Sequence, residues 1–167
     1  SIPGGEIYQA LEKGTIDAAE WIGPYDDQKL GFNKVAPYYY YPGWWEGSAD
    51  LEFFINNKAF DKLSPENKAI VQAAAAVAAA DMTSKYGALN PQALKRLVAN
   101  KTKLTLFPKA VMDAGFKASM EVFEEHSAKS PDFKKINDDM RAFQRDQILW
   151  NRFSEFPFNQ YMNSVKI

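Results

Sequence analysis

The spacing of apolar residues predicts short helices and extended segments in the first third of the chain. Residues 6–13 place apolar side chains on one helical face, and Gly14 is positioned to end that helix. Residues 15–21 read as a short extended segment, and a brief helix over 25–30 ends at Gly31. A helix and an extended segment joined by one glycine are typical of α/β architecture.

Two further stretches have the composition of β-strands. Residues 35–41 are rich in tyrosine, but Pro37 restricts them to a sheet edge or to the start of a strand. Residues 51–56 are mostly apolar, which predicts a strand buried on both faces. Pro42-Gly43 turns the chain between them, so residues 44–47 are expected in a loop.

Beyond residue 60 the pattern is mainly helical. Ser64, Pro65 and Glu66 combine an N-cap hydroxyl, a proline in the first turn and an acid near the positive end of the helix dipole. We expect the helix that starts there to end near Leu89, before Asn90-Pro91. The elements expected after it are a short helix over 91–100, a strand over 103–107, a helix over 108–129, and a last helix from 130 that Pro157 interrupts.

The C-terminal part of the chain is rich in large apolar side chains. The last predicted helix carries a stripe of them at helical spacing: Phe133, Ile136, Met140, Phe143 and Trp150. The series continues with Phe153, Phe156, Phe158, Tyr161, Met162 and Val165. Because leaving such side chains in water costs free energy, we expect them to pack on another part of the protein or on a second copy in a homodimer.

Composition and charge narrow the functional classes. Hydrophobic residues make up 46% of the 167 residues, enough for a core. The 20 basic and 21 acidic residues nearly cancel, so we expect neither a nucleic-acid partner nor attraction to anionic membranes. The absence of cysteine excludes thiol chemistry and disulfides. The chain has no initiator Met, so we expect that a leader was removed or that the chain is a piece of a longer protein.

Enzyme motifs are sparse. The chain contains no GxSxG, Walker, GxGxxG or HExxH sequence. Its single histidine, His126, lies late in a predicted helix, where a solvated side chain is expected. These features indicate that the protein is not an enzyme.

Candidate chemistry is concentrated in residues 11–47, which hold three of the four tryptophans and two acids beside indole rings, Glu20-Trp21 and Trp45-Glu46. Carboxylate and main-chain carbonyl oxygens suit a hard cation such as Na⁺ or Ca²⁺, and indole rings form an apolar wall around a small ligand. In an extended segment Glu20 and Trp21 point to opposite faces, so one could offer its side chain and the other its carbonyl oxygen.

Two interpretations of this stretch stay open. Its acids and indoles line a ligand cleft, or the aromatic rings belong to the core and the acids are solvated. Asp17 and Asp26 fit turn and capping roles better than ligand binding.

One long motif closely resembles the extracytoplasmic solute-binding subunits of TRAP transporters, the DctP-like family: GGEIYQALEKGTIDAAEWIGPYDDQKLGF, followed by KVAPYYYYPGWWEG. The resemblance is strongest to the subgroup that binds α-keto acids and other 2-oxo or 2-hydroxy carboxylates. It implies an α/β fold of the periplasmic binding protein type II-like class, in which two lobes close on an organic anion and long helices bridge them. It assigns residues 1–60 to the lobe that carries the ligand and cation motif. Residues 61–167 become the bridging and C-terminal helices, with the short strand 103–107.

The resemblance also implies a function and a site. A periplasmic receptor captures a small organic acid together with a metal cation, Na⁺ or Ca²⁺, and delivers it to the membrane permease subunits, without an organic cofactor. In the subgroup a Glu-Trp pair helps to hold the cation, and it matches Glu20 and Trp21. Glu46 is carried over as a neighbour of both cation and acid, and Trp21 and Trp44 as ligand-binding residues.

The resemblance covers only the C-terminal portion of the family members, which are considerably longer. In the family, the arginine that pairs with the substrate carboxylate lies upstream of the matched region. The arginines of this chain are all in its later helical part: Arg96, Arg141, Arg145 and Arg152. Because a bidentate arginine is the main expected device for recognising a carboxylate, we expect the 167-residue chain alone to bind pyruvate-like acids weakly or not at all.

Two other functional classes compete with this one. A carbohydrate-active enzyme or sugar binder would use Glu20 and Glu46 as acid and base, with indole rings stacked on the sugar. A helical interaction module would depend only on the aromatic C-terminus.

Overall fold

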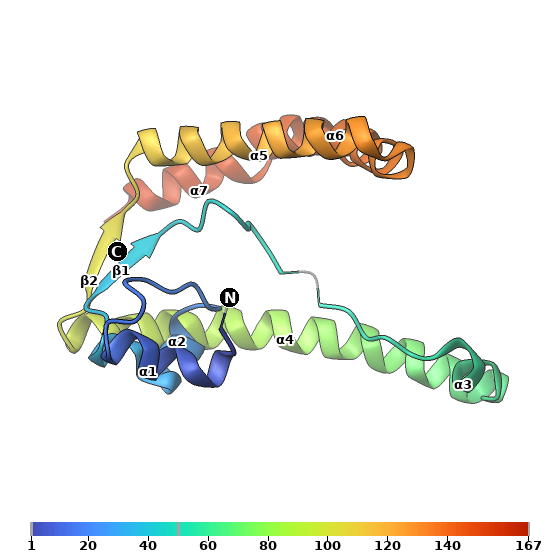
Figure 1. Cartoon of the computed structure of the whole chain (residues 1–167), viewed down its shortest axis with the longest axis horizontal. Coiled ribbons are helices and arrows are strands. Elements are labelled where there is room, and N and C mark those ends of the chain that lie inside the picture. The colour runs from blue at the N-terminus through green and yellow to red at the C-terminus, as the bar shows by residue number, and fades with distance from the viewer. Residues whose placement is uncertain (1, 50, 167) are drawn as a thin grey trace. The chain divides into compact units, whose positions relative to one another are not determined.

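The computed structural model describes residues 2–49 and 51–166, and the chain divides into two compact units, Ser1–Pro108 and Lys109–Ile167 (Figure 1). The elements of the first unit are η1 (Gly4–Glu6), α1 (Ile7–Glu12), α2 (Pro24–Leu30), η2 (Phe32–Lys34), β1 (Tyr38–Tyr41), α3 (Asn57–Asp61), α4 (Pro65–Ala99) and β2 (Lys103–Leu106). Those of the second are α5 (Lys109–Lys129), α6 (Pro131–Phe153) and α7 (Glu155–Ser164).

The two described strands pair in parallel, with Tyr38 opposite Lys103 and Tyr41 opposite Leu106. β2 confirms the strand predicted over 103–107. β1 is shorter than the predicted 35–41 because it begins directly after Pro37, which cannot donate to a strand partner. Parallel strands need a long crossover, and α3 and α4 supply it here.

The strand predicted over 51–56 is wrong within the described residues, where the segment is irregular. Phe53 and Phe54 are 80% and 85% exposed instead of buried on two faces. An apolar run signals burial but does not supply the neighbouring strand that must bond its backbone, and this segment has none among the described residues. The extended segment predicted over 15–21 likewise contains no strand and follows an irregular path between α1 and α2.

Helix α4 starts as predicted, with the Ser64 hydroxyl accepting a hydrogen bond from the Asn67 N–H at 3.2 Å. The expected end near Leu89 is wrong, because α4 continues through Pro91 to Ala99. A proline inside a helix costs about 3 kcal/mol. Tertiary packing offsets this cost, since the turns beyond Pro91 bury Ala93 and Leu97 completely or almost completely.

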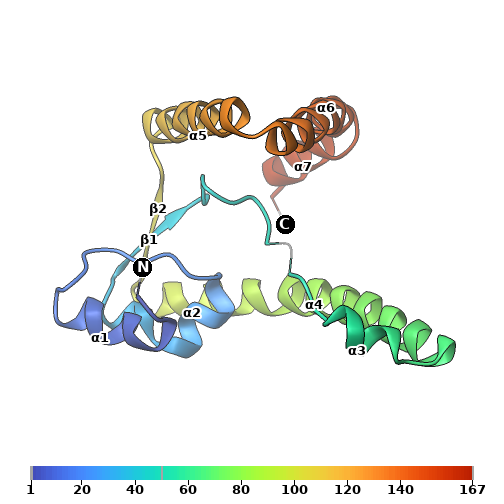
Figure 2. The same cartoon turned by 45° about the vertical axis from the view of Figure 1, so that its right-hand side comes forward.

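The core of the first unit lies where α2 runs along α4, an arrangement that both views show (Figures 1 and 2). Asn90 of α4 also accepts a hydrogen bond from the Tyr25 N–H at the start of α2, at 3.1 Å. Short helix α2 is therefore held by the C-terminal third of a helix that spans roughly 52 Å at 1.5 Å per residue over its 35 residues.

In the second unit, α5 packs on α6 through a narrow set of contacts. The rings of Phe123 and Phe133 stack with centroids 6.4 Å apart, and the Arg141 guanidinium lies 5.0 Å from the Phe123 ring centroid. The predicted apolar stripe of α6 is largely outside this contact: Ile136 is 70% exposed and Phe143 is also exposed. Beyond Phe133, the stripe is therefore exposed in the described residues: Ile136, Met140, Phe143 and Trp150.

The last helix is interrupted at Ser154 and not at Pro157, which corrects the prediction. Pro157 lies in the first turn of α7, where a backbone N–H has no helical acceptor to lose. His126 is exposed, as expected, with its ring 5.5 Å from that of Phe133. No helix in the described residues is both long and apolar enough to cross a membrane.

We predict that Leu97→Ala destabilises the first unit by about 2–5 kcal/mol, because it leaves a cavity where Leu97 is 1% exposed. Val98→Ala is the control on the same helix turn, since Val98 is 48% exposed, and it should cost less than about 1 kcal/mol. Urea unfolding followed by circular dichroism measures both. Equal losses in the two variants would contradict the proposed core.

Candidate functional site

The Trp21 indole is held on two sides. Gly4 of η1 lies against its six-membered ring so closely that a side chain at this position would collide with it. The ring of Phe32 meets it edge-on, with centroids 6.5 Å apart and planes at 89°. Trp21 is therefore fixed in orientation, although part of the ring is exposed.

Glu20, the acid next to this fixed indole, is exposed in the irregular segment between α1 and α2. The segment is not a strand, so strand alternation does not set the directions of the two side chains. The main chain after Trp21 is held by Asp27, whose Oδ1 accepts hydrogen bonds from the N–H groups of Ile22 at 3.4 Å and Gly23 at 3.3 Å.

Asp27 is buried, at 8% exposed, and its other oxygen accepts a hydrogen bond from the Tyr39 hydroxyl at 2.5 Å. Burial raises the pKa of Asp27 above its ordinary value, against the lowering effect of these hydrogen bonds. Burial and the hydrogen bond to Asp27 together raise the pKa of Tyr39. The pair is thus a polar link between α2 and β1, with Asp27 buried and Tyr39 half-buried.

A small hollow of about 70 Å³ lies beneath the Trp21 segment. Its walls include Trp21, Asp27, Tyr39, Leu97 and Thr102. The buried Thr102 hydroxyl has no hydrogen-bond partner among the described residues. Most of the lining is apolar, and the carboxylate of Asp27 and the hydroxyls of Tyr39 and Thr102 are among its few polar groups.

The second predicted group, Trp44 to Glu46, follows the carboxyl end of β1. The two indoles meet edge-on at 5.4 Å, and the Trp45 ring lies on Gly43 and edge-on to Phe107 at 6.3 Å. Glu46 is exposed beside them. Ligands of α/β proteins commonly bind beyond the carboxyl ends of parallel strands, so this loop is well placed to contact one.

The two halves of the predicted site, Glu20-Trp21 and Trp44 to Glu46, pack against different residues. The contacts of Trp21 involve Gly4 and Phe32, and those of Trp45 involve Gly43 and Phe107, so the two groups share no aromatic neighbour. The joint site of Glu20, Trp21, Trp44 and Glu46 stays a prediction.

Asp17 and Asp26 are the two acids expected in turn and capping roles. Asp17 is exposed in a bend, and Asp26 accepts a hydrogen bond from the Tyr86 hydroxyl at 2.6 Å. Sequence reasoning missed the role of Asp27. The available signal was Gly23 before Pro24, a helix start that lacks a capping side chain of its own.

The oxygen chemistry of the predicted cation ligands fits a hard cation. Carboxylates of Glu20 and Glu46 and the main-chain carbonyl of Trp21 are ligands of the type that Na⁺ and Ca²⁺ take. No group of three or more His, Cys, Asp or Glu side chains gathers in the part of the chain that the structure describes. A cation at these residues would therefore need further oxygens from the bound acid or from water.

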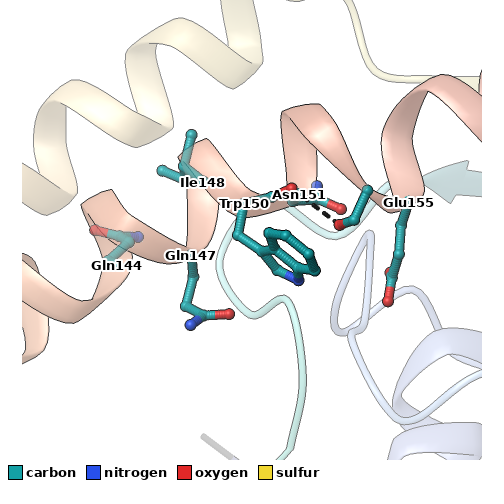
Figure 3. Close-up of a pocket in the computed structure, with 7 residues that line it drawn as sticks. Gln144, Gln147, Ile148, Trp150, Asn151 and Glu155 are labelled. Carbon is teal, nitrogen blue, oxygen red and sulfur yellow. Dashed lines mark hydrogen bonds between the residues drawn. The ribbon is translucent and has the colours of Figure 1, made fainter.

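A larger hollow, of about 350 Å³, lies at the junction of α6 and α7 (Figure 3). It is open to solvent and is lined by Gln144, Gln147, Ile148, Trp150, Asn151, Ser154 and Glu155. Its lining contains no basic side chain to pair with an organic anion, so the hollow does not suit the predicted ligand.

Comparison with known proteins identifies relatives of this chain. The model of the family described as bacterial extracellular solute-binding protein family 7, DctP, matches residues 1–130. The monocarboxylate 2-oxoacid-binding periplasmic protein all3028 of Nostoc sp. is 44% identical over 163 residues, which are 98% of this chain and 45% of that protein.

Two solved structures share the fold closely. A TRAP transporter solute-binding protein from Bordetella bronchiseptica is 50% identical to this chain, with a TM-score of 0.92. The match covers 98% of this chain and 49% of that protein. Its structure is a mixed-occupancy dimer with calcium and picolinate bound at one active site and an apo second site. A TRAP periplasmic solute-binding protein from Pseudoalteromonas atlantica, with bound sodium and pyruvate, is 38% identical to this chain, with a TM-score of 0.89. The match covers 99% of this chain and 50% of that protein.

These relatives confirm the predicted fold class, since the chain has the fold of about half of a TRAP solute-binding protein, of the periplasmic binding protein type II-like class. The chain spans about half the length of the relatives that it matches. Solute binding is the shared activity of the family and of the named relatives, which does not favour the carbohydrate-active alternative.

We predict that stability declines in alkali through Tyr39. Its raised pKa means that the folded state keeps the phenol proton where the unfolded chain loses it, so the stabilisation is complete below pH 10.0 and is lost as pH rises above it. The difference in unfolding free energy between the unchanged protein and Tyr39→Phe should therefore be constant up to about pH 9 and shrink above about pH 10. Tyr40→Phe, on the exposed side of β1, is the control. The same trend in both variants would contradict a special role of Tyr39.

Proposed function

The chain belongs to bacterial extracellular solute-binding protein family 7, the DctP family, and on this premise we propose that it is the solute-binding component of a TRAP-type secondary transporter. Its ligand is a small 2-oxo or 2-hydroxy carboxylate that binds together with Na⁺ or Ca²⁺. One observation carries this proposal: relatives 38% and 50% identical to this chain contain a small organic acid and a metal cation together.

Glu20, Trp21 and Glu46 hold the cation in this proposal. Their oxygens are hard ligands, and the fixed Trp21 indole keeps the adjoining carbonyl in a defined place. Trp21, Trp44 and Glu46 contact the organic acid. Two indoles exclude water from one side of the ligand, which strengthens the attraction between the cation and the carboxylate.

Closure of two lobes explains how such a receptor works without chemistry. Residues 1–60 contribute the ligand and cation motif, and residues 61–167 contribute the bridging and C-terminal helices. The acid and the cation together favour the closed state to the extent that they bind it more tightly than the open state. The closed receptor then delivers the acid from the periplasm to the permease subunits in the membrane, and the protein is not an enzyme.

A homodimer through the C-terminal aromatic helix is a second part of the proposal. Phe156, Phe158 and Tyr161 of α7 are all exposed, as are Trp150 and Phe153 at the end of α6. Exposed apolar surface on this scale marks an interaction surface. A second copy is the favoured occupant because the 50% identical relative forms a dimer.

We predict that pyruvate binding depends on a cation and on Glu20. Calorimetry on the complete product of the gene should show binding with Ca²⁺ or Na⁺ and at least about a tenfold loss in Glu20→Gln, which removes a charged oxygen ligand. Glu12→Gln, an exposed acid of α1 in the same unit, is the matched control and should bind normally. Pyruvate binding that ignores both the cation and Glu20→Gln would refute the proposed site.

We predict that Phe158→Asp lowers the mass measured by light scattering from that of a dimer to that of a monomer. A charge in place of an exposed apolar side chain would have to be desolvated when two copies associate. Asn159→Asp places the same side chain one residue further along α7 and should keep the dimer. A mass that stays unchanged in Phe158→Asp and after removal of residues 157–167 argues against a dimer through this tail.

A further inference from the structure

Asp27 is a buried acid whose hydrogen bonds converge on the segment that carries the proposed cation ligands. The described ion pairs are four exposed lysine-acid pairs of α5 and α6, and Asp27 belongs to none of them. A buried carboxylate without a cation is expensive, so its hydrogen bonds must compensate for the lost water. Those bonds come from Ile22, Gly23 and Tyr39.

The bond from Ile22 has a particular consequence for Trp21. The Ile22 N–H and the Trp21 C=O belong to one peptide group, and in a trans peptide these two bonds point in opposite directions. The Trp21–Ile22 bond is trans, since the cis bond of the described chain is Tyr41–Pro42. A carboxylate that accepts from Ile22 therefore directs the Trp21 carbonyl oxygen away from Asp27.

We propose that Asp27 and Tyr39 form a positioning pair that aims the Trp21 carbonyl at the cation, an inference that rests on the proposed function. Asp27 orients the peptide group and, through its negative charge on the N–H, makes the carbonyl oxygen a stronger electron donor. Tyr39 holds the second oxygen of Asp27 at 2.5 Å, so the first oxygen stays turned toward the segment. Partners of this kind commonly change metal affinity 10- to 100-fold.

Strand pairing restrains the position of Tyr39, the second member of the pair. Tyr39 is opposite Leu104 in the parallel register, so its main chain cannot shift without disturbing β2. The Trp21 indole is anchored separately by Gly4 and Phe32. The Trp21 ring is therefore held by Gly4 and Phe32, and the peptide group after it is held by Asp27. This double restraint leaves the Trp21 carbonyl little freedom to rotate.

Helix α2 supplies a matched control for this pair. Asp26 also accepts a short hydrogen bond from a tyrosine, Tyr86 of α4, at 2.6 Å. That bond fastens α2 to α4, whereas the described hydrogen bonds of the Ile22 and Gly23 N–H groups go to Asp27. Tyr39→Phe and Tyr86→Phe thus remove the same kind of bond from neighbouring residues, and only the first should affect the Trp21 peptide group.

The first measurement needs neither ligand nor cation. Hydrogen exchange by NMR on the complete gene product should show faster exchange of the Ile22 and Gly23 amides, by roughly tenfold, in Asp27→Asn and Tyr39→Phe but not in Tyr86→Phe. Unchanged exchange at both amides in the first two variants would overturn the inference, whatever the protein binds. If Asp27→Asn does not fold, Tyr39→Phe keeps the carboxylate and carries the test.

The second measurement is a Ca²⁺ titration of the same variants, with Glu20→Gln as the reference for the site. Asp27→Asn and Tyr39→Phe should weaken Ca²⁺ binding about tenfold or more, and Tyr86→Phe less than about twofold. If Glu20→Gln weakens Ca²⁺ binding and the pair variants do not, the positioning role is wrong while the proposed function stands. If none of these variants alters Ca²⁺ binding, the cation site fails and the inference fails with it.

Discussion

The packing of α2 against the C-terminal third of α4 is the contact on which the first unit depends. It buries Leu97 and Ala93, and through Asn90 it fixes the first turn of α2. Since β2 begins four residues after α4 ends, the same helix also places the strand that pairs with β1. The Trp21 segment precedes α2, and the Trp44 loop follows β1. One helix-helix contact therefore sets the positions of both predicted halves of the site.

Rigidity is unevenly distributed in that site. The Trp21 ring and the peptide group after it are fixed by packing and by Asp27, whereas the carboxylates of Glu20 and Glu46 are exposed. A fixed carbonyl costs little ordering entropy when a ligand arrives, and exposed carboxylates avoid desolvation until a ligand arrives. This combination suits a receptor that must stay open without ligand and close with it. The proposed lobe closure is where the carboxylates would lose water and gain the cation.

Local signals predicted most of the elements, and tertiary contacts account for the failures. Ser64 and Ser130 have the hydroxyl caps that mark the starts of α4 and α6, and both starts were predicted. The predicted end of α4 near Leu89 was wrong, because the free energy gained by burying Leu97 outweighs the cost of placing Pro91 inside a helix. The position of Asp27 beneath the Trp21 segment could not be predicted either, because its partner Tyr39 is twelve residues away and meets it only after β1 has formed.

The exposed apolar segments reflect one physical cause. Residues 51–56 and the stripe of α6 have the composition and spacing of buried elements, yet Phe54 and Ile136 are among the exposed large apolar residues of the chain. Apolar periodicity reflects the contacts that a segment makes in its complete assembly. In the proposed receptor the tail meets a second copy. Residues 51–56 are irregular and have no strand partner among the described residues, so the exposed rings of Phe53 and Phe54 mark a second apolar surface without cover there.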